Sequence, residues 1–396
     1  MPGPLDGIRI LDLSRILAGP FATQLLGDMG ADVIKVERPG RGDDTRSWGP
    51  PFVKGTDEKN LPESAYYLSA NRNKRSVAVD MASEAGAALI RQMAGECDVL
   101  VENFKPQGLE KYGLDHDSLC TLYPGLIYCS ISGFGQSGPN AHRPGYDLLA
   151  QAMSGIMAIT GDPQGEPMKV GVGIADVMCG MYAANAIQAA LIHKMKTGEG
   201  QHIDIALADT TTSWLVNAGT NFLLGGSEER LGNQHPNIVP YQVFAVADGH
   251  VIVAAGNDGQ FQRFCAIIGR EDMAVDGRFA SNPARLANRE ALIPVLQAAL
   301  EMWPKDLLIA KMEQNGVPGG PINSLAEVFE SEQVKARGMK IAMEFPGAEG
   351  GRVDLIGNPV KFSVTPVSYR RPPPQCGAHT DEVLQEMLGM VPEAEE

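Results

Sequence analysis

The 396-residue sequence has few cysteines, and none of them forms a CxxC pair. A chain of this length with so few scattered cysteines is not expected to depend on a disulfide framework. Four of the six lie among apolar residues and are expected to act as small core side chains. The six are Cys97, Cys120, Cys129, Cys179, Cys265 and Cys376.

The sequence also lacks a basic surplus and a long apolar run. Its net charge of −15 argues against general nucleic-acid binding, although a local basic cluster could still hold an anion. The opening residues "MPGPLDGIRI" have neither the basic nor the apolar region of a signal peptide. The apolar stretch 177–193 is too short for a membrane span and includes Tyr182, Asn185 and Gln188. We therefore expect a cytoplasmic protein with no membrane partner.

The signatures of common nucleotide and metal sites are missing. The turn after the first predicted strand reads "SRILAGP", without the GxGxxG that admits a pyrophosphate, although Glu37 ends the second strand where a ribose-binding carboxylate would stand. There is no P-loop, and no HExxH or paired-cysteine spacing indicates a metal. A tightly bound cofactor is not expected.

Strands and helices alternate in the first part of the chain. β-Branched runs predict strands over 8–13, 31–37, 75–81, 98–104 and 126–135, with helical patterns over 20–30 and 84–96. This alternation predicts a doubly wound α/β fold with a parallel sheet. A further strand leading into a helix is predicted over 200–216.

The pattern changes near residue 223, where Gly, Pro and Asn become frequent. A hairpin is predicted around Asp248-Gly249, followed by helices over 260–270 and 285–315. We assign 1–225 to the first part of a large domain, 226–325 to a smaller domain, and 326–396 to the rest of the large one. In this last part "KIAMEF" and "VKFSV" are predicted strands, and Thr380 is predicted to cap a closing helix.

Two groups of basic residues lie beside predicted strands: one group directly precedes the strand 75–81, and the other follows the end of the strand 31–37. Such a cluster is either a set of solvated loop ends or a phosphate-binding rim, and the spacing does not decide between them. The residues are Arg38, Arg41, Arg46, Arg72, Lys74 and Arg75.

Asp176 is the only formally charged residue between Val170 and His193. An aspartate directly before a run of small helical residues is a favoured N-cap, so a purely structural role explains it. The alternative is a carboxylate that does chemistry in a pocket without other charges. Asp209 stands in the same kind of strand-to-helix context, and the pattern does not separate the two.

Two other stretches are ambiguous. None of the seven histidines forms a Ser/His/Asp or Cys/His pattern. The polar loop "AAGNDGQFQ" at 254–262 is either a hairpin turn or a mobile flap over a site.

Taken together, an ordered series of motifs resembles the family III CoA-transferases, which include formyl-CoA transferase and carnitine CoA-transferase. The series begins with "LDGIRILDLSRILAGPFATQLLGDMGADVIKVERPGRGDDTR" and continues with "NRNKRSVAVD", "DVLVENFKPQGLEKYG", "SISGFGQSGP", "RPGYDLLAQAMSG" and "KTGEGQHIDIALAD". It ends with "GAHTDEVL", so the resemblance covers essentially the whole chain.

The resemblance implies roles for particular residues. The family nucleophile lies thirty residues after the Tyr of a "GYD"-like segment, which selects Tyr146 and Asp176 and not Asp209. Leu17 replaces a glutamine that lines the formyl-CoA transferase site, which argues against formyl and oxalyl substrates. The remaining roles are CoA contacts at Ala18, Arg38, Asn73, Lys74, Arg75, Asn103 and Phe104, a basic residue near the phosphates at Arg143, and a flap at Gly256, Asn257, Asp258, Gly259 and Gln260.

A carboxylate nucleophile suits CoA transfer because it can form an anhydride with the acyl group and then carry CoA as an aspartyl thioester. Desolvation would raise the pKa of Asp176, and a helix N-terminus is expected to offset that rise. Backbone N–H groups of the flap could stabilise the oxyanions, and flap closure could exclude water.

The resemblance further implies a Rossmann-like large domain built from both chain ends, a smaller inserted domain and an interlocked homodimer. Acyl-CoA and carboxylic acids are the expected partners, with succinyl-CoA favoured as donor.

Two alternatives remain at this stage. The first is an α-methylacyl-CoA racemase, which has a histidine where Tyr146 stands; a tyrosine with an ordinary pKa near 10 is a poor base at neutral pH. The second is a non-catalytic acyl-CoA-binding protein, against which the intact Asp176 and flap argue.

Overall fold

The computed structural model describes residues 2–56 and 59–390 of the chain. The chain forms two compact units. The first comprises Met1–Ile156, Val170–Leu215 and Glu332–Glu396, and the second comprises Met157–Lys169 and Val216–Ser331. The predicted small domain 226–325 falls inside the second unit, which also includes 157–169.

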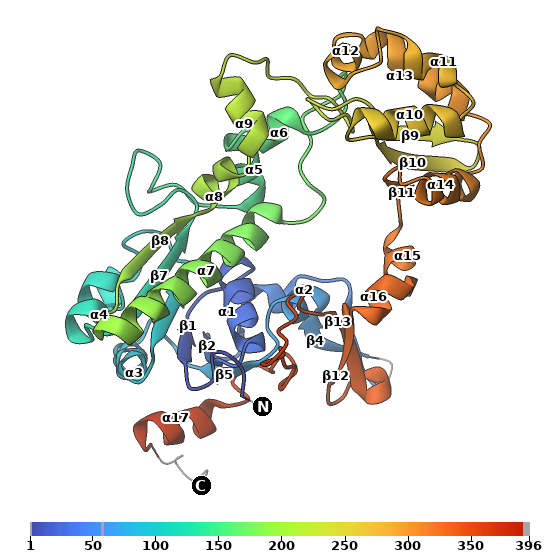
Figure 1. The fold of residues 1–396 in the computed structure, drawn as a ribbon. Helices are drawn as coiled ribbons and strands as arrows, with labels where there is room; N and C mark the ends of the chain where they lie inside the picture. Colours follow the sequence, from blue (N-terminus) through green and yellow to red (C-terminus); the bar gives the residue numbers. More distant parts are fainter. Residues whose placement is uncertain (1, 57–58, 391–396) are drawn as a thin grey trace. The chain divides into compact units, whose positions relative to one another are not determined.

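The first unit is built around a six-stranded parallel sheet (Figure 1). In spatial order the strands are β5 (Lys74–Ala78), β2 (Asp32–Glu37), β1 (Arg9–Asp12), β6 (Val99–Glu102), β7 (Ile127–Ser132) and β8 (His202–Ala206). The chain thus runs outward from β1 to one edge and then outward from β6 to the other. This order is that of the doubly wound fold, and it creates a switch point between β1 and β6.

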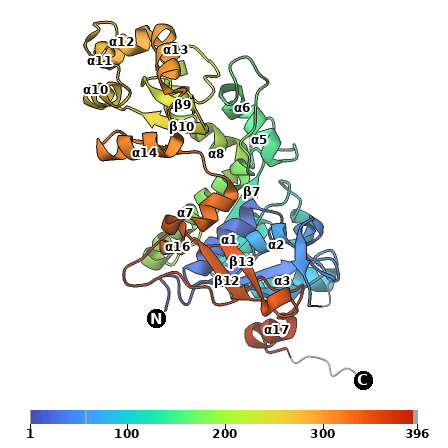
Figure 2. The ribbon, with the colours of Figure 1, turned by 90° about the vertical axis from the view of Figure 1, so that its right-hand side faces the viewer.

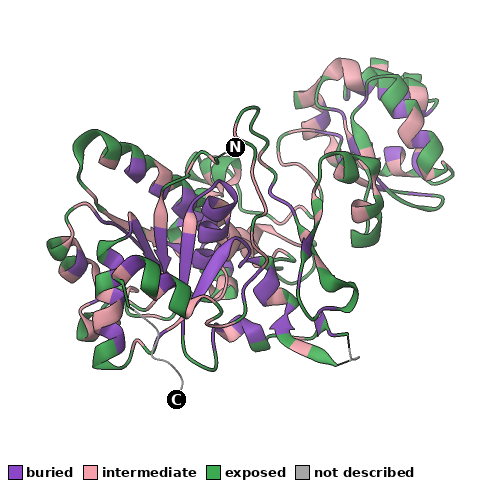
Figure 3. Ribbon diagram, turned by 90° about the horizontal axis from the view of Figure 1, so that it is seen from below, coloured by how far each residue is buried: buried purple, intermediate pink, exposed green. Residues whose placement is uncertain are grey.

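Helices cover both faces of this sheet, and all of its strands except the edge strand β8 are buried along most of their length (Figure 3). On one face α1 (Ala18–Asp28) and α7 (Ile174–Thr197) form a core with β1, β6 and β7. Gly180 lets these two helices meet, since a Cβ there would lie 2.6 Å from the carbonyl oxygen of Ala18. On the other face the core includes α3 (Glu84–Gly95), α4 (His116–Leu122) and α17 (Thr380–Leu388).

Smaller elements complete the first unit. Figure 2 shows the hairpin of β12 and β13 beside α2, and these elements share a small apolar core. The elements are the 3-10 helices η1 (Asp44–Ser47), η2 (Glu110–Tyr112) and η3 (Glu349–Gly351), the strands β3 (Phe52–Lys54), β4 (Asn60–Ser64), β12 (Lys340–Glu344) and β13 (Arg352–Ile356), and the helices α2 (Ala65–Ser69), α5 (Asp147–Met153), α8 (Leu207–Ser213) and α16 (Glu332–Ala336).

The second unit has its own core beneath a three-stranded antiparallel sheet. Its strands are β9 (Tyr241–Val246), β10 (Gly249–Ala254) and β11 (Gly319–Pro321). Its helices are α9 (Val216–Leu223), α10 (Asp258–Ile267), α11 (Glu271–Val275), α12 (Asn282–Ala287), α13 (Arg289–Leu300), α14 (Lys305–Gln314) and α15 (Leu325–Glu330), and α6 (Ile156–Ile159) leads into it.

Three predictions about elements are wrong. The single helix predicted over 285–315 is three helices, interrupted at Asn288 and at Pro304, which has no N–H to donate. The segment "VKFSV" is not a strand and lies between Pro359 and Pro366. Thr380 is the first residue of α17 and not its cap; its hydroxyl accepts the N–H of Ala78 at 3.0 Å.

Helix α7 is long and apolar enough, by length and composition alone, to cross a membrane. Core helices of globular proteins pass the same test. One side of this helix is buried against α1 and the sheet, at residues that recur every three or four positions. These are Ala175, Cys179, Gly180, Ala183, Ala184, Ile187, Ala190 and Leu191.

Candidate active site

A cavity of about 180 Å³ opens at the carboxyl ends of the central strands. Its walls include the segments that follow β1 and β6, among them Leu17, Ala18, Asn103 and Phe104. Because β1 and β6 flank the switch point of the sheet, the chain diverges there and leaves space for a ligand. Asp176 lines the same cavity, and we call it the Asp176 cavity.

Asp176 lies in the first turn of α7, but it does not cap that helix. The helix begins after Gly173, which has no side chain to offer. The carboxylate of Asp147 takes the capping role instead: its Oδ1 accepts the N–H of Ala175 at 2.8 Å and that of Asp176 at 3.3 Å. The carboxylate of Asp176 is thereby left unengaged by the helix end.

The surroundings of Asp176 make its negative charge unfavourable. Burial raises the pKa of this carboxyl to about 7, and the nearby charge of Asp147 adds to the increase. Near neutral pH the carboxyl group can therefore lose its proton within the working range of an enzyme. A partly desolvated anion of this kind is poised as a nucleophile or base.

Asp209, the competing candidate, is at the same position of its own helix. It lies in the first turn of α8, but it is exposed and does not line the Asp176 cavity. The geometry thus supports the choice of Asp176 that the family spacing had made.

Other predicted site residues gather around Asp176. Leu17 immediately precedes α1 and gives the cavity an apolar wall. Tyr146 precedes α5 and is 64% exposed beside the cavity. The guanidinium of Arg143 lies over the ring of Phe134 and makes one long hydrogen bond, 3.5 Å, to Asn140. No ion pair of Arg143 occurs among the described residues, so it is available to an anionic ligand.

A second cavity, of about 410 Å³, lies beside the first and shares Arg15 and Phe104 with it. It contains Arg38 and Arg41 at the end of β2, and we call it the Arg38 cavity. Arg15 is stacked on Phe104, with its guanidinium carbon 5.4 Å from the ring centroid. The two cavities adjoin at Arg15 and Phe104, and their lining carries charges of both signs, including the guanidinium groups of Arg38 and Arg143 that could meet an anionic ligand.

Three predicted CoA contacts lie elsewhere. Asn73, Lys74 and Arg75 are 3%, 0% and 3% exposed and line neither cavity. The ammonium of Lys74 donates to Asp12 at 3.0 Å, while burial lowers the pKa of Lys74 to about 8. Arg75 forms ion pairs with three carboxylates, those of Asp32, Glu382 and Glu386. In this structure these side chains hold β5, α1 and α17 together and are not free to meet CoA.

The basic cluster is therefore neither a solvated surface nor, in the main, a phosphate rim. Arg46 and Arg72 are also buried, in pairs with Glu37 and Asp28 respectively. Both carboxylate oxygens of Glu37 are used by these internal contacts, so it does not offer a ribose-binding carboxylate. Of the six basic residues, only Arg38 and Arg41 line either the Asp176 cavity or the Arg38 cavity.

The predicted flap belongs to the second unit and begins α10. Side-chain hydrogen bonds hold this turn, because Asn257 accepts the N–H of Gln260 at 2.9 Å and the Gln260 carboxamide accepts the N–H of Gly256 at 2.8 Å. Asp258 is tied to the buried guanidinium of Arg285 at 2.8 Å. The flap is thus a preformed helix start, closed by reciprocal side-chain bonds.

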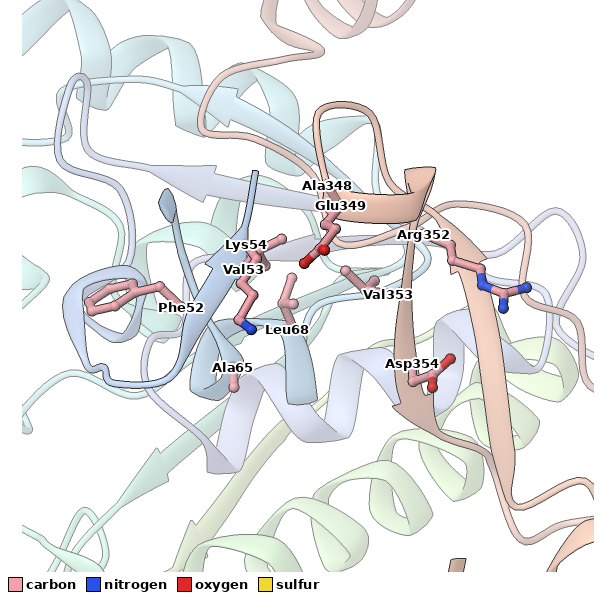
Figure 4. Close-up of a pocket in the computed structure, with 10 residues that line it drawn as sticks. All are labelled: Phe52, Val53, Lys54, Ala65, Leu68, Ala348, Glu349, Arg352, Val353 and Asp354. Carbon is pink, nitrogen blue, oxygen red and sulfur yellow. The ribbon is translucent and has the colours of Figure 1, made fainter. Parts of the chain in front are cut away.

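A further cavity, of about 260 Å³, lies between β3, α2 and β13 (Figure 4). Its rim carries charges of both signs, from Lys54, Glu349, Arg352 and Asp354. In Figure 4 the guanidinium of Arg352 extends away from Lys54 and Glu349. This cavity includes no predicted site residue. Across residues 2–56 and 59–390, no group of three His, Cys, Asp or Glu side chains is placed to hold a metal ion.

Three residues near Asp176 were not predicted from the sequence. Asp147 directly follows Tyr146 in the "GYD" segment, but its contact with a helix 28 residues later leaves no local signal. Arg15 and Tyr66 stand in no motif that would mark them as site residues. Burial and the nearby charges of Asp176, Asp147 and Asp43 raise the pKa of Tyr66 to about 12, which keeps the phenol protonated.

Known proteins resemble this chain over its full length. A succinate–glutarate CoA-transferase of Agrobacterium fabrum is 51% identical over 385 residues, 97% of this chain and 96% of its own. A human succinyl-CoA:glutarate CoA-transferase is 45% identical over 386 residues, 97% of this chain and 86% of its own.

A solved structure agrees. The crystal structure of a CAIB/BAIF family protein from Brucella suis superimposes with a TM-score of 0.86 at 47% identity, covering 98% of this chain and 100% of that one. Residues 5–380 of the chain match the sequence model of CoA-transferase family III. The chain therefore belongs to the family III CoA-transferases, enzymes that use CoA thioesters as substrates.

Proposed function

We propose that this CoA-transferase moves CoA between short dicarboxylic acids, with succinyl-CoA as donor and an acid of the glutarate class as acceptor. The relatives at 51% and 45% identity carry those two acids in their names. Leu17 in the cavity wall is consistent with this choice, since it replaces the glutamine expected of a formyl-CoA enzyme.

Asp176 is the proposed nucleophile. Its carboxylate attacks the thioester carbonyl of the donor, which forms a mixed anhydride and releases CoA as thiolate. The thiolate attacks the aspartyl carbonyl, forming an aspartyl-CoA thioester and freeing the donor acid. The acceptor carboxylate then attacks this thioester, forming a second mixed anhydride and releasing CoA as thiolate. The thiolate attacks the acceptor carbonyl of that anhydride, which forms the new acyl-CoA and frees the carboxylate of Asp176.

The observation that carries this proposal is the state of Asp176: it lines a cavity, is not engaged as a cap, and has a pKa of about 7. A carboxylate that only stabilised the helix would accept its N–H groups, as Asp147 does. The desolvation that raises the pKa also makes the anion more reactive towards a carbonyl.

The flap supplies the proposed oxyanion donors. At the start of α10 the N–H of Gln260 is taken by Asn257, whereas no acceptor is described for the N–H groups of Asp258 and Gly259. Free N–H groups at a helix N-terminus favour negative charge. We propose that they stabilise the tetrahedral oxyanions.

The test is to trap the intermediate. The protein is incubated with succinyl-CoA and treated with hydroxylamine or borohydride, and the modified peptide is mapped by mass spectrometry. Modification at Asp176 is expected, and Asp176→Ala should lose both the adduct and at least about 1000-fold in transfer rate. Normal transfer by that variant would show that the nucleophile is another residue, and α-proton exchange without an adduct would indicate a racemase.

A further inference from the structure

The turn that joins β1 to α1 forms part of the Asp176 cavity and has an unusual backbone. Arg15, Ile16 and Leu17 all line the cavity. Ile16 has a φ of 71°, in the left-handed region. A β-branched residue is strained there, because its side chain crowds the backbone. Something other than the preference of Ile16 must therefore hold the turn.

Two side chains from other segments hold it. On one side Asn103 accepts the N–H of Arg15 at 2.8 Å and donates to the Arg15 carbonyl at 2.7 Å. On the other side the N–H of Ile16 is shared between both carboxylate oxygens of Asp43, each at 3.3 Å. The strained residue thus sits between a carboxamide and a carboxylate that are far from it in sequence.

Asp43 is itself fixed. It is 2% exposed and forms an ion pair of 2.9 Å with Lys35, which is fully buried. The Nζ of Lys35 also donates to the carbonyl of Ser14 at 2.9 Å. Thr45 donates to Asp43 from its N–H and its hydroxyl, at 3.0 and 2.7 Å. The Lys35–Asp43 pair therefore holds the turn through hydrogen bonds at two points, the Ser14 carbonyl and the Ile16 N–H.

The same pair borders the other cavity, since Lys35 and Asp43 both line the Arg38 cavity. We propose that Asp43 is a positioning residue for CoA transfer: it holds Ile16 in the left-handed conformation and so sets the shape of the Asp176 cavity. This inference rests on the proposed function in one respect: its test measures the rate of CoA transfer. Asp43 does not line the Asp176 cavity and takes no part in the chemistry.

The experiment combines Asp43→Asn with Ile16→Gly. An asparagine has one acceptor oxygen, which cannot serve Lys35, Thr45 and Ile16 together, so the turn should relax. We expect kcat to fall about 10- to 100-fold, with less than about a threefold change in the KM for acyl-CoA. Glycine adopts a positive φ without strain, so adding Ile16→Gly to Asp43→Asn should restore most of the lost kcat.

Asp44→Asn is the matched control. It removes the carboxylate of Asp44, which lines the Arg38 cavity and pairs with Arg15 and Arg41. This carboxylate makes no hydrogen bond to Ile16. Any loss that it causes should not be restored by Ile16→Gly. Asp43→Ala, which keeps no acceptor, should give a larger loss than Asp43→Asn with the same rescue.

Three results would overturn the inference: an unchanged kcat in Asp43→Asn, a loss that Ile16→Gly does not restore, or a rise in KM alone. Thermal melts identify variants that fail to fold. If both Asp43 variants fail to fold, Lys35→Met replaces them, and its kcat in solution and the φ of Ile16 in its crystals are measured. If neither value changes, the Lys35–Asp43 pair does not hold the turn. Failure of the proposed function appears separately, as absence of transfer by the wild-type protein. In that case the φ of Ile16 in crystals of Asp43→Asn still decides whether Asp43 holds the turn.

Discussion

Asp147 and Asp176 are two carboxylates at one helix end with different environments. Asp147 accepts N–H groups of α7 and the side chain of Gln151, whereas Asp176 has its pKa raised to about 7. Burial and the neighbouring charge of Asp147 disfavour the charged form of Asp176. The capping residue and the proposed nucleophile are thus separate, and each can be tested alone.

The pH dependence of transfer should report Asp176. Because the carboxylate is the reactive form, kcat/KM should rise with pH and level off above a midpoint of about 7. Asp147→Asn removes the negative charge that helps to raise this pKa, so the midpoint should move to lower pH. Pre-steady-state adduct formation, measured from about pH 5 to pH 9, checks both expectations, and an unmoved midpoint would show that Asp147 is not the second cause.

The raised pKa also has a stability consequence. A carboxyl whose folded pKa lies above its unfolded value of 3.8 favours the fold while protonated, and that contribution is lost as pH rises from about 4 through 7. Asp176→Asn should therefore be more stable than the wild type at pH 8, by about 1–3 kcal/mol. Urea unfolding should show the difference vanish near pH 4. Asp209→Asn, on an exposed site, is the control and should show no such trend.

Arg143 could contact either of two anionic groups: a phosphate of CoA or the second carboxylate of a dicarboxylic acid. As a phosphate contact it should favour acyl-CoA binding, so Arg143→Gln should raise the Kd of acyl-CoA about tenfold through loss of a charge-assisted bond. Calorimetry with CoA measures this directly. An unchanged CoA affinity, with a higher KM for dicarboxylates but not for monocarboxylates, would instead assign Arg143 to the second carboxylate of the acid.

The sequence identifies Asp176 only with the help of the family spacing, because Asp209 has the same local pattern. It does not reveal Asp147, Asp43 or the strain at Ile16, since each depends on a contact between segments distant in the chain. For the same reason Lys74 and Arg75 suggested ligand contacts: a run of basic residues does not show that carboxylates from β1, β2 and α17 neutralise it.

At the scale of elements, periodicity predicts the buried strands well and the interruptions less well. The six strands of the parallel sheet begin within two residues of their predicted starts, and the apolar runs of β1, β2, β6 and β7 are buried along most of their length. The break between α13 and α14 is marked only by Pro304, within a pattern that remains apolar at helical spacing. "VKFSV" has strand-like composition but no partner strand among the described residues, and composition cannot supply one.

The start of α10 offers an element-scale prediction. Gln260→Ala removes the bond to the Gly256 N–H, so the flap should open more often and its stability should fall by about 1 kcal/mol. Hydrogen exchange of amides 256–260 should speed up accordingly. Gln262→Ala on the same helix is exposed and serves as the control. Equal exchange in both variants would mean that Asn257 and the Asp258–Arg285 pair hold the flap without Gln260.

At the scale of the whole molecule, the two ends of the chain belong to one unit. Arg75 in β5 pairs with Glu382 and Glu386 of α17, and His379 accepts the N–H of Ser76 at 3.2 Å. These contacts join residues about 300 positions apart. The second unit consists of two segments, Met157–Lys169 and Val216–Ser331, with Val170–Leu215 of the first unit between them, and its core shares no residue with the cores of the first.

An exposed apolar side of α7 bears on assembly. Met181, Tyr182, Ile192 and Met195 are 47%, 41%, 54% and 80% exposed, although the helix belongs to the core unit. Large exposed apolar groups gathered on one element mark an interaction surface. The homodimer implied by the family resemblance would cover them, and we expect sedimentation equilibrium to give twice the chain mass of 42.3 kDa.

Dilution distinguishes an interlocked dimer from one held by a surface alone. Interlocked chains cannot separate without opening, so the dimer mass should persist to nanomolar concentration and be lost only together with the far-UV circular dichroism signal. Met195→Glu places a charge on the exposed side of α7; it should weaken a surface-held dimer but leave the mass of an interlocked one unchanged. A folded monomer on dilution of either protein would contradict interlocking, because separation would then cost no unfolding.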